Sequence, residues 1–185
     1  MARDEQAIRD ELLVLRCQRG ERAAFAELFH QWERRLFYYV RRLVPQEADA
    51  WDALQKTWLK VLRDIRRLRD PAHLRVWLYR LARNTAVSHF RLERALRTRL
   101  ESEGDVGDMV CSEELFQLED AELVHHALGR LPLPFREVLT LHYVEDMSLV
   151  EISAVLGVPV GTVKSRLYYA KRAMRDLLLS EGKRP

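Results

Sequence analysis

Apolar residues recur every three to four positions along almost the whole chain, and no segment alternates apolar and polar residues as a half-buried strand would. This spacing predicts an all-α fold. Glycine and proline together account for only 13 of the 185 residues, so few positions interrupt the helices. The expected helices are Ala7–Arg19, Arg22–Leu43, Glu47–Leu68, one beginning at Asp70-Pro71, Glu119–Arg130, Pro134–Val144, Ser148–Leu156 and Val160–Leu179.

A strongly acidic segment divides these helices into two groups. Nine acidic residues and no base occur between residues 100 and 123, and apolar periodicity is lost as far as Cys111. Such a segment, which also contains two glycines, is typical of a flexible linker. We therefore expect two small helical domains, at residues 1–99 and 119–185, joined by a flexible acidic linker at residues 100–118.

The acidic segment separates two basic blocks. Residues 63–99 contain eleven arginines against three acidic residues, and residues 160–185 contain seven bases against two acids. Two basic blocks around an acidic spacer are expected of a protein that binds a polyanion in two places. A basic helix is often only a solvated surface, so charge alone leaves both interpretations open.

The second domain ends in the pattern of a helix-turn-helix. Ser148 and Glu151 have the spacing of a capping box, in which each side chain satisfies a free N–H group at a helix start. Gly157 suits a left-handed turn and Pro159 prevents continuation of the short helix before a long basic one. The solvent face of that last helix is a plausible major-groove surface. Its candidate residues are Lys164, Ser165, Tyr168, Tyr169, Arg172 and, nearer the core, Arg166.

One flank of the fourth helix mixes an aromatic ring, an amide and cations. The residues that recur there at helical spacing are Trp77, Arg80, Asn84, Ser88 and Arg91. Such groups bind single-stranded DNA, because the ring stacks on a base, the amide bonds to a base edge and guanidiniums bind the backbone. A tryptophan that packs on the rim of its own domain is the commoner arrangement, and it stays open here.

The sequence contains no pattern typical of catalysis or metal binding. Its six histidines form no His-x-x-x-His motif, its two cysteines have no ligand cluster nearby, and no glycine-rich phosphate loop occurs. It also has no run of about 18 apolar residues and no apolar signal core at the N-terminus. We expect a cytoplasmic protein that is not an enzyme, has no cofactor, metal or small-molecule substrate, and is not inserted in a membrane.

Both halves of the chain resemble parts of bacterial sigma factors. In the second half, Leu131–Leu139, Ser148–Gly157 and Val160–Leu167 are similar to the C-terminal domain that reads DNA. In the first half, Asp52–Trp58 resembles the segment that grips the polymerase clamp, and Trp77–Asn84 resembles the promoter-melting helix. The two halves in this order are similar to the extracytoplasmic-function (ECF) group of the sigma-70 family.

The resemblance implies an alternative sigma factor that responds to a stress or another signal. Such a protein joins core RNA polymerase through its clamp helices and flap, opens promoter DNA at the −10 element and reads the −35 element. An anti-sigma factor is implied as a further partner.

The expected site residues follow from the helix faces together with the resemblance. Lys164, Ser165, Arg166, Tyr168, Tyr169 and Arg172 would contact the −35 element. Single-stranded −10 DNA would meet Leu68, Asp70, His73, Trp77, Arg80, Leu81, Asn84 and Arg91. Polymerase would contact Asp52, Leu54, Gln55 and Lys56.

Two departures from the family pattern and two alternative functions accompany this interpretation. Lys56 stands where the family usually has an acid, and Tyr169 stands where a basic residue is common. One alternative is a conventional helix-turn-helix regulator that does not dock on polymerase. The other is an interaction protein that binds polymerase and never touches DNA.

Overall fold

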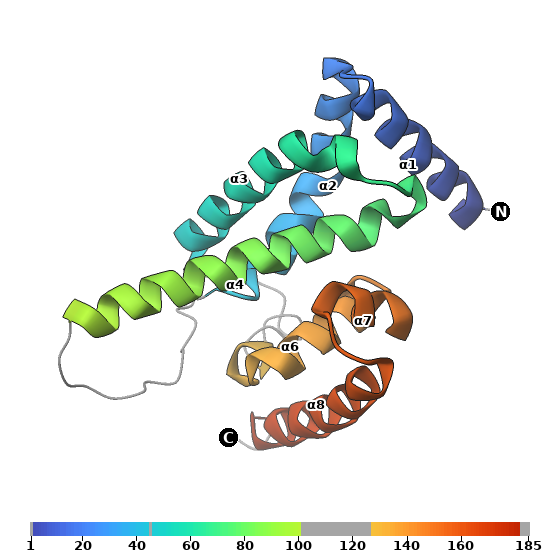
Figure 1. Cartoon of the computed structure of the whole chain (residues 1–185). Coiled ribbons are helices and arrows are strands. Elements are labelled where there is room, and N and C mark those ends of the chain that lie inside the picture. The colour runs from blue at the N-terminus through green and yellow to red at the C-terminus, as the bar shows by residue number, and fades with distance from the viewer. Residues whose placement is uncertain (1, 45, 101–126, 182–185) are drawn as a thin grey trace.

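The structure, a computed structural model, describes residues 2–44, 46–100 and 127–181 (Figure 1). Every regular element within these residues is helical, which confirms the all-α prediction. The α-helices are α1 (Ala2–Gln18), α2 (Arg22–Arg41), α3 (Glu47–Asp64), α4 (Leu74–Leu100), α6 (Leu133–Leu139), α7 (Leu149–Leu156) and α8 (Val160–Glu181). Two 3-10 turns, η1 (Ile65–Arg67) and η2 (Pro71–His73), and a π-helical segment, η3 (Thr140–Val144), complete the set.

Helices α1 to α4 form the first domain around a single apolar core. Helix α2 contributes a buried stripe at helical spacing that includes Leu28, Trp32 and Leu36. Helices α3 and α4 pack side by side against this stripe (Figure 1). Trp58 of α3 lies with its ring centroid 4.9 Å from that of Phe29, which ties α3 to α2. These contacts fix the rotation of α4 about its own axis.

The connection between α3 and α4 is tighter than the sequence pattern predicts. Helix α3 ends at Asp64 and not at Leu68, because the next three residues close into the 3-10 turn η1. Asp70 caps a helix start as expected, accepting a hydrogen bond from the N–H of Ala72 at 3.0 Å. The turn that it caps is the 3-10 turn η2, and α4 begins only at Leu74.

Helices α6, α7 and α8 form the second domain and confirm the helix-turn-helix. The hydroxyl of Ser148 accepts from the N–H of Glu151 at 3.2 Å, and the Glu151 carboxylate accepts from the N–H of Ser148 at 2.8 Å. Gly157 adopts the left-handed conformation, with φ of +67°, as the turn requires. The predicted helix Pro134–Val144 is present, but its last five residues widen into the π-helical segment η3.

Two sequence expectations lie outside the described residues. The predicted linker at residues 100–118 falls almost wholly there, and so does most of the helix predicted at Glu119–Arg130, of which residues 127–130 are described and helical. The first helix begins at Ala2, five residues before the predicted start.

The two domains meet in the structure, with α7 packed on α4 and α8 on the far side of α7 (Figure 1).

Replacing Ser148 by alanine should lower the free energy of unfolding by about 1 kcal/mol, because the N–H of Glu151 then loses its acceptor. Thermal and urea unfolding followed by circular dichroism would measure the change. Ser88→Ala, at an exposed position of α4, is the matched control and should change the value by less than about 0.5 kcal/mol. Equal effects of the two substitutions would show that the cap contributes nothing.

Candidate nucleic-acid interface

Helix α8 presents its basic face to solvent because its apolar stripe is used in the core. Val163, Leu167 and Ala170 are buried in the second domain. The residues predicted to read duplex DNA lie on the opposite side, where the structure exposes Lys164, Ser165, Tyr168, Tyr169 and Arg172. Arg166 is half-buried, as its expected place near the core edge requires.

The chemistry of the α8 face is mixed and suited to DNA. The Tyr168 and Tyr169 side chains are 62% and 56% exposed, which is high for rings with so much apolar surface. A shallow hollow beside them is lined by Tyr168, Lys171, Arg172 and Arg175, so cations and a ring share one concave surface. Ser165 donates its hydroxyl proton to the carbonyl of Thr162 at 3.0 Å, which leaves the oxygen free to accept.

The second predicted surface lies on α4. Trp77 is half-buried, and Arg80 and Asn84 are exposed one and two turns further along the same flank. Leu81 is half-buried and packs against the core beside them. Part of the Trp77 ring packs on its own domain, and the rest of the ring is accessible. Arg91 belongs to the helical backbone of α4, but its side chain lies outside the described residues.

The turn that leads into α4 is held by a residue that sequence reasoning missed. The Gln18 side-chain amide at the end of α1 donates to the carbonyl of Leu68 at 2.8 Å and to that of Ile65 at 3.1 Å. On the other side of the turn, Asp70 accepts from Ala72 and lies 2.8 Å from Nδ1 of His73. The loop is therefore fixed at both ends before any ligand binds.

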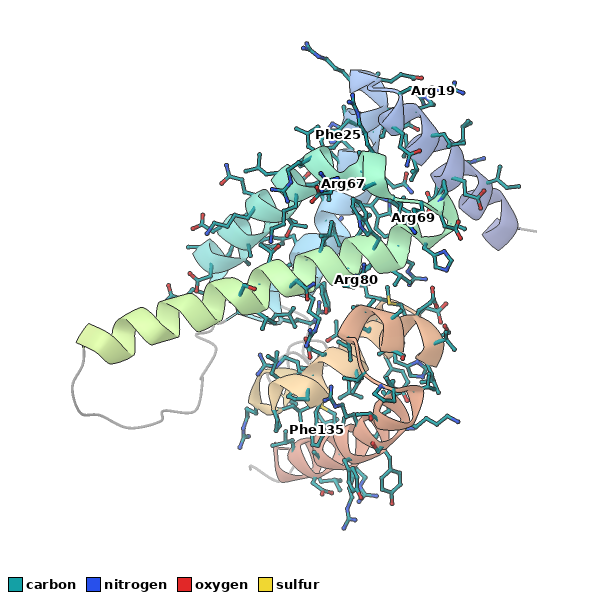
Figure 2. The ribbon with its side chains drawn as sticks, in the orientation of Figure 1. Arg19, Phe25, Arg67, Arg69, Arg80 and Phe135 are labelled. Carbon is teal, nitrogen blue, oxygen red and sulfur yellow. The ribbon has the colours of Figure 1, made fainter. Side chains whose placement is uncertain are left out.

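Further cations lie on this connection and along α4. Arg67 and Arg69 lie on the connection between α3 and α4, and Arg80 lies further along α4 (Figure 2). All three side chains are exposed. On α3, Lys60 donates to the hydroxyl of Thr85 at 3.0 Å, which brings another cation one turn along α4 from Leu81. The sequence shows that residues 63–99 are rich in arginine, but it does not show that Lys60 lies against α4.

The predicted polymerase-binding residues of α3 do not all share one face. Asp52, Gln55 and Lys56 are exposed, but Leu54 is only 2% exposed and packs in the core. The expectation that Leu54 contacts a partner is therefore corrected, because helical spacing places it on the buried side. The exposed face continues instead to two apolar residues that the sequence analysis did not single out, Leu59 and Leu62.

The described residues form neither a metal site nor a membrane-spanning helix. No group of three or more histidine, cysteine, aspartate or glutamate side chains there is arranged to hold a metal ion. None of the helices in the same residues is both long and apolar enough to cross a membrane.

Comparison with known protein families relates the two halves to one family. Residues 28–96 match Sigma-70 region 2, and residues 121–174 match Sigma-70, region 4. The chain is 32% identical over 184 residues to the RNA polymerase sigma-H factor of Pseudomonas aeruginosa, covering 91% of this chain and 93% of that protein. It is 29% identical over 180 residues to the ECF RNA polymerase sigma-E factor of Escherichia coli K12, with 91% and 94% covered.

Solved structures show the same relationship. The chain is similar to CnrH in a complex with the cytosolic domain of CnrY, with a TM-score of 0.69, 27% identity and coverage of 92% of this chain and 97% of that one. Its fold is also similar to that of RpoE from Bartonella quintana in a complex with the anti-sigma factor NepR. That match has a TM-score of 0.66 and 22% identity, and covers 83% and 96% of the two chains.

Replacing Arg172 by alanine should weaken binding of the full chain to mixed-sequence duplex DNA. The slope of log K against log salt concentration should fall by about one, because one phosphate-neutralising cation is lost. Fluorescence anisotropy of a labelled duplex between 50 and 200 mM salt would measure both. Arg22→Ala removes the same charge from the exposed start of α2 and should leave the slope unchanged. Equal slopes for all three proteins would contradict a phosphate contact by Arg172.

Proposed function

Because the chain belongs to the ECF group of the sigma-70 family, we propose that its two exposed surfaces divide promoter recognition between them. The protein is an alternative sigma factor that directs transcription by core RNA polymerase from specific promoters. In the proposed division, α8 reads the −35 element as duplex and α4 with its preceding loop binds the −10 element as single strand. The observation that carries this proposal is that Lys164, Ser165, Tyr168, Tyr169 and Arg172 are exposed on α8, while Arg80 and Asn84 are exposed on α4.

In the −35 complex, α8 would lie in the major groove with its N-terminal half at the base edges. Lys164 suits the O6 and N7 acceptors of guanine, and the Ser165 oxygen suits a base amino group. Tyr168 and Tyr169 offer apolar ring surface to thymine methyl groups. Arg166, at the core edge of the face, and Arg172, one turn beyond Tyr168 and Tyr169, would contact phosphates and set the register of the helix. Tyr169 replaces a basic residue common in the family, which favours a −35 preference particular to this protein.

In the −10 complex, a base flipped out of the non-template strand would enter between α4 and the loop before it. Leu68, Asp70 and His73 would contribute the loop side, with Leu81 and Asn84 on the helix. Trp77 would stack on an exposed base, and Arg80 and Arg91 would bind the backbone. The hydrogen bonds of Gln18 to the loop support this assignment, because a loop that is ordered in advance loses less entropy on binding.

Docking on polymerase would use the exposed face of α3. Asp52, Gln55 and Lys56 offer polar contacts, and Leu59 and Leu62 are 62% and 57% exposed along the same helix. Apolar side chains this exposed next to polar ones are typical of a protein interface. Lys56 reverses the charge usual at its position, so its partner on polymerase would be an acceptor or an acid.

Sigma factors are transcription initiation factors, and we propose that this one has no catalytic activity and needs no cofactor, since polymerase performs the reaction. It would act in the cytoplasm, where polymerase is found. An anti-sigma factor would hold it inactive, as expected from relatives whose structures contain CnrY or NepR as partners.

Purified protein mixed with bacterial core polymerase and fragmented genomic DNA should produce transcripts with new 5′ ends. The start sites should share two upstream motifs and be absent with core alone. Lys164→Ala should reduce these transcripts at least severalfold, whereas Arg22→Ala should not. Binding to core without new starts would favour the polymerase-interaction protein. Failure to bind core would favour the conventional regulator.

Asn84→Ala should relax promoter choice at one position of the −10 element. In the wild type, a wrong base at that position should lower initiation about 5- to 150-fold, because each mismatch is worth about 1–3 kcal/mol. In the variant, the same wrong base should lower initiation little. Sequencing transcripts from a promoter library randomised at −10 would measure it. Arg22→Ala, at the exposed start of α2 and away from this flank, is the control. A variant that lost activity equally on every promoter would contradict base recognition by Asn84.

A further inference from the structure

The loop between α3 and α4 has few hydrogen bonds of its own. In the 3-10 turn η1, the N–H of Leu68 donates to the carbonyl of Ile65 at 3.1 Å. In η2, the N–H groups of His73 and Ala72 donate to the carbonyl and the carboxylate of Asp70 at 3.1 and 3.0 Å. Each of these bonds lies within one turn, so together they do not fix one turn relative to the other. The position of the loop therefore depends on contacts from outside it.

One side chain supplies the hydrogen bonds from outside. Gln18, half-buried at the end of α1, donates from its amide to the carbonyl of Leu68 at 2.8 Å and to that of Ile65 at 3.1 Å. A primary amide has two N–H donors, so both are used. Ile65 is only 2% exposed and lies in the core, whereas Leu68 leads directly into the exposed Arg69. Gln18 thus joins the core end of η1 to the end that enters the proposed DNA site.

The end of α1 is itself held by a Schellman motif. The N–H of Gly20 donates to the carbonyl of Cys17 at 2.9 Å, and the N–H of Glu21 donates to that of Arg16 at 3.2 Å. Gly20 has a φ of +85°, the left-handed conformation that this motif requires and that favours glycine. Because the motif ends the helix at a defined residue, the backbone of Gln18 is fixed where its side chain reaches the loop.

Helix α1 lies close against the loop along its last turns. A Cβ atom at position 20 would lie 3.3 Å from Nη2 of Arg66 in η1, so the backbone there approaches the loop closely. The helix packs against both η1 and η2, and Figure 1 shows it beside the connection from α3 to α4. Leu13 and Val14 are buried and anchor the same helix in the core of the first domain. Helix α1 is therefore a rigid support for the loop.

We propose that Gln18 is a positioning residue for base recognition at the −10 element. This inference rests on the proposed assignment of the loop and α4 to single-stranded DNA. A base in that site would meet Leu68, Asp70 and His73 on the loop side. These side chains discriminate between bases only while the backbone that carries them keeps one shape. Gln18 would not touch the base, and it would act by holding that backbone.

Loss of the two hydrogen bonds should reduce base selectivity more than DNA binding. A matched base would have to order a loose loop when it binds, whereas a wrong base makes few loop contacts in either case. Binding of the DNA backbone by Arg80 on α4 does not depend on the loop. The ratio of initiation with the matched base to initiation with a wrong base should fall about fivefold to tenfold, as expected when two neutral hydrogen bonds are lost.

Three substitutions separate the donor function of Gln18 from its size. Gln18→Met keeps the length of the side chain and removes both donors. Gln18→Glu keeps the shape, but its ionised carboxylate only accepts and would face two carbonyl oxygens, so its effect should be at least as large. Gln18→Lys, whose ammonium group has three donors, should keep most of the selectivity. The matched control is Gln31→Met, which removes an amide that donates from α2 to Asp10 of α1 at 2.6 Å, two turns from Gln18.

Hydrogen exchange of the free full chain, followed by mass spectrometry, would test the restraint without DNA. A peptide covering residues 65–73 should exchange severalfold faster in Gln18→Met than in the wild type, because the loop opens more often. The same peptide should be unchanged in Gln31→Met, and peptides from α8 should be unchanged in both variants. Unchanged exchange over residues 65–73 in a folded Gln18→Met protein would overturn the proposal.

Sequencing of transcripts made with core polymerase from two promoter libraries would test the selectivity. With Gln18→Met, preference should relax in the library randomised at −10 and stay as in the wild type in a library randomised at −35, which α8 would read. Equal relaxation in both libraries, or the same relaxation with Gln31→Met, would overturn the proposal. Faster loop exchange without any promoter-specific starts from the wild type would support the restraint by Gln18 and contradict the proposed function.

Discussion

Burial of one face of α4 determines where the rest of the molecule lies. Leu74, Leu78 and Ala82 must face the core, and this requirement fixes the rotation of the helix. Once the rotation is fixed, successive residues are distributed to three different environments. Arg80 is left in solvent on the flank proposed for DNA, and Arg83, three positions later, is turned to the second domain. Core packing therefore places Arg80 and Arg83 on different surfaces of this helix.

The local signals in the sequence were sufficient for most of the fold. The capping box at Ser148, the glycine at 157 and the apolar stripe of α8 each act over a few residues, so they predicted the helix-turn-helix and the exposed face of α8. Leu54 was assigned wrongly because a family motif was carried over as a block, whereas helical spacing alone would have placed it inside. The turn after Asp64 and the π-helical segment depend on packing that local propensity does not describe.

Contacts between distant parts of the chain could not be predicted. Arg83 and Glu137 are 54 positions apart, and each resembles an ordinary surface charge in the sequence. Gln18 and Leu68 are 50 positions apart, and nothing in the pattern around Gln18 marks it as a partner for a loop. Both contacts exist only because folding brings together residues that carry no shared local pattern. One of them joins the two domains, and the other holds the loop before α4.

The hydrogen bonds from Gln18 have a consequence for how this protein diverges from its relatives. They connect the end of α1 with the loop proposed to admit a base, although α1 itself carries none of the residues assigned to DNA. A change in α1 that removes Gln18 would therefore release the proposed base-binding loop fifty residues away, while every side chain proposed to contact DNA is retained. Two relatives with identical loops and identical α4 helices would then differ in how firmly that loop is held, through a helix that carries none of the residues proposed to contact DNA.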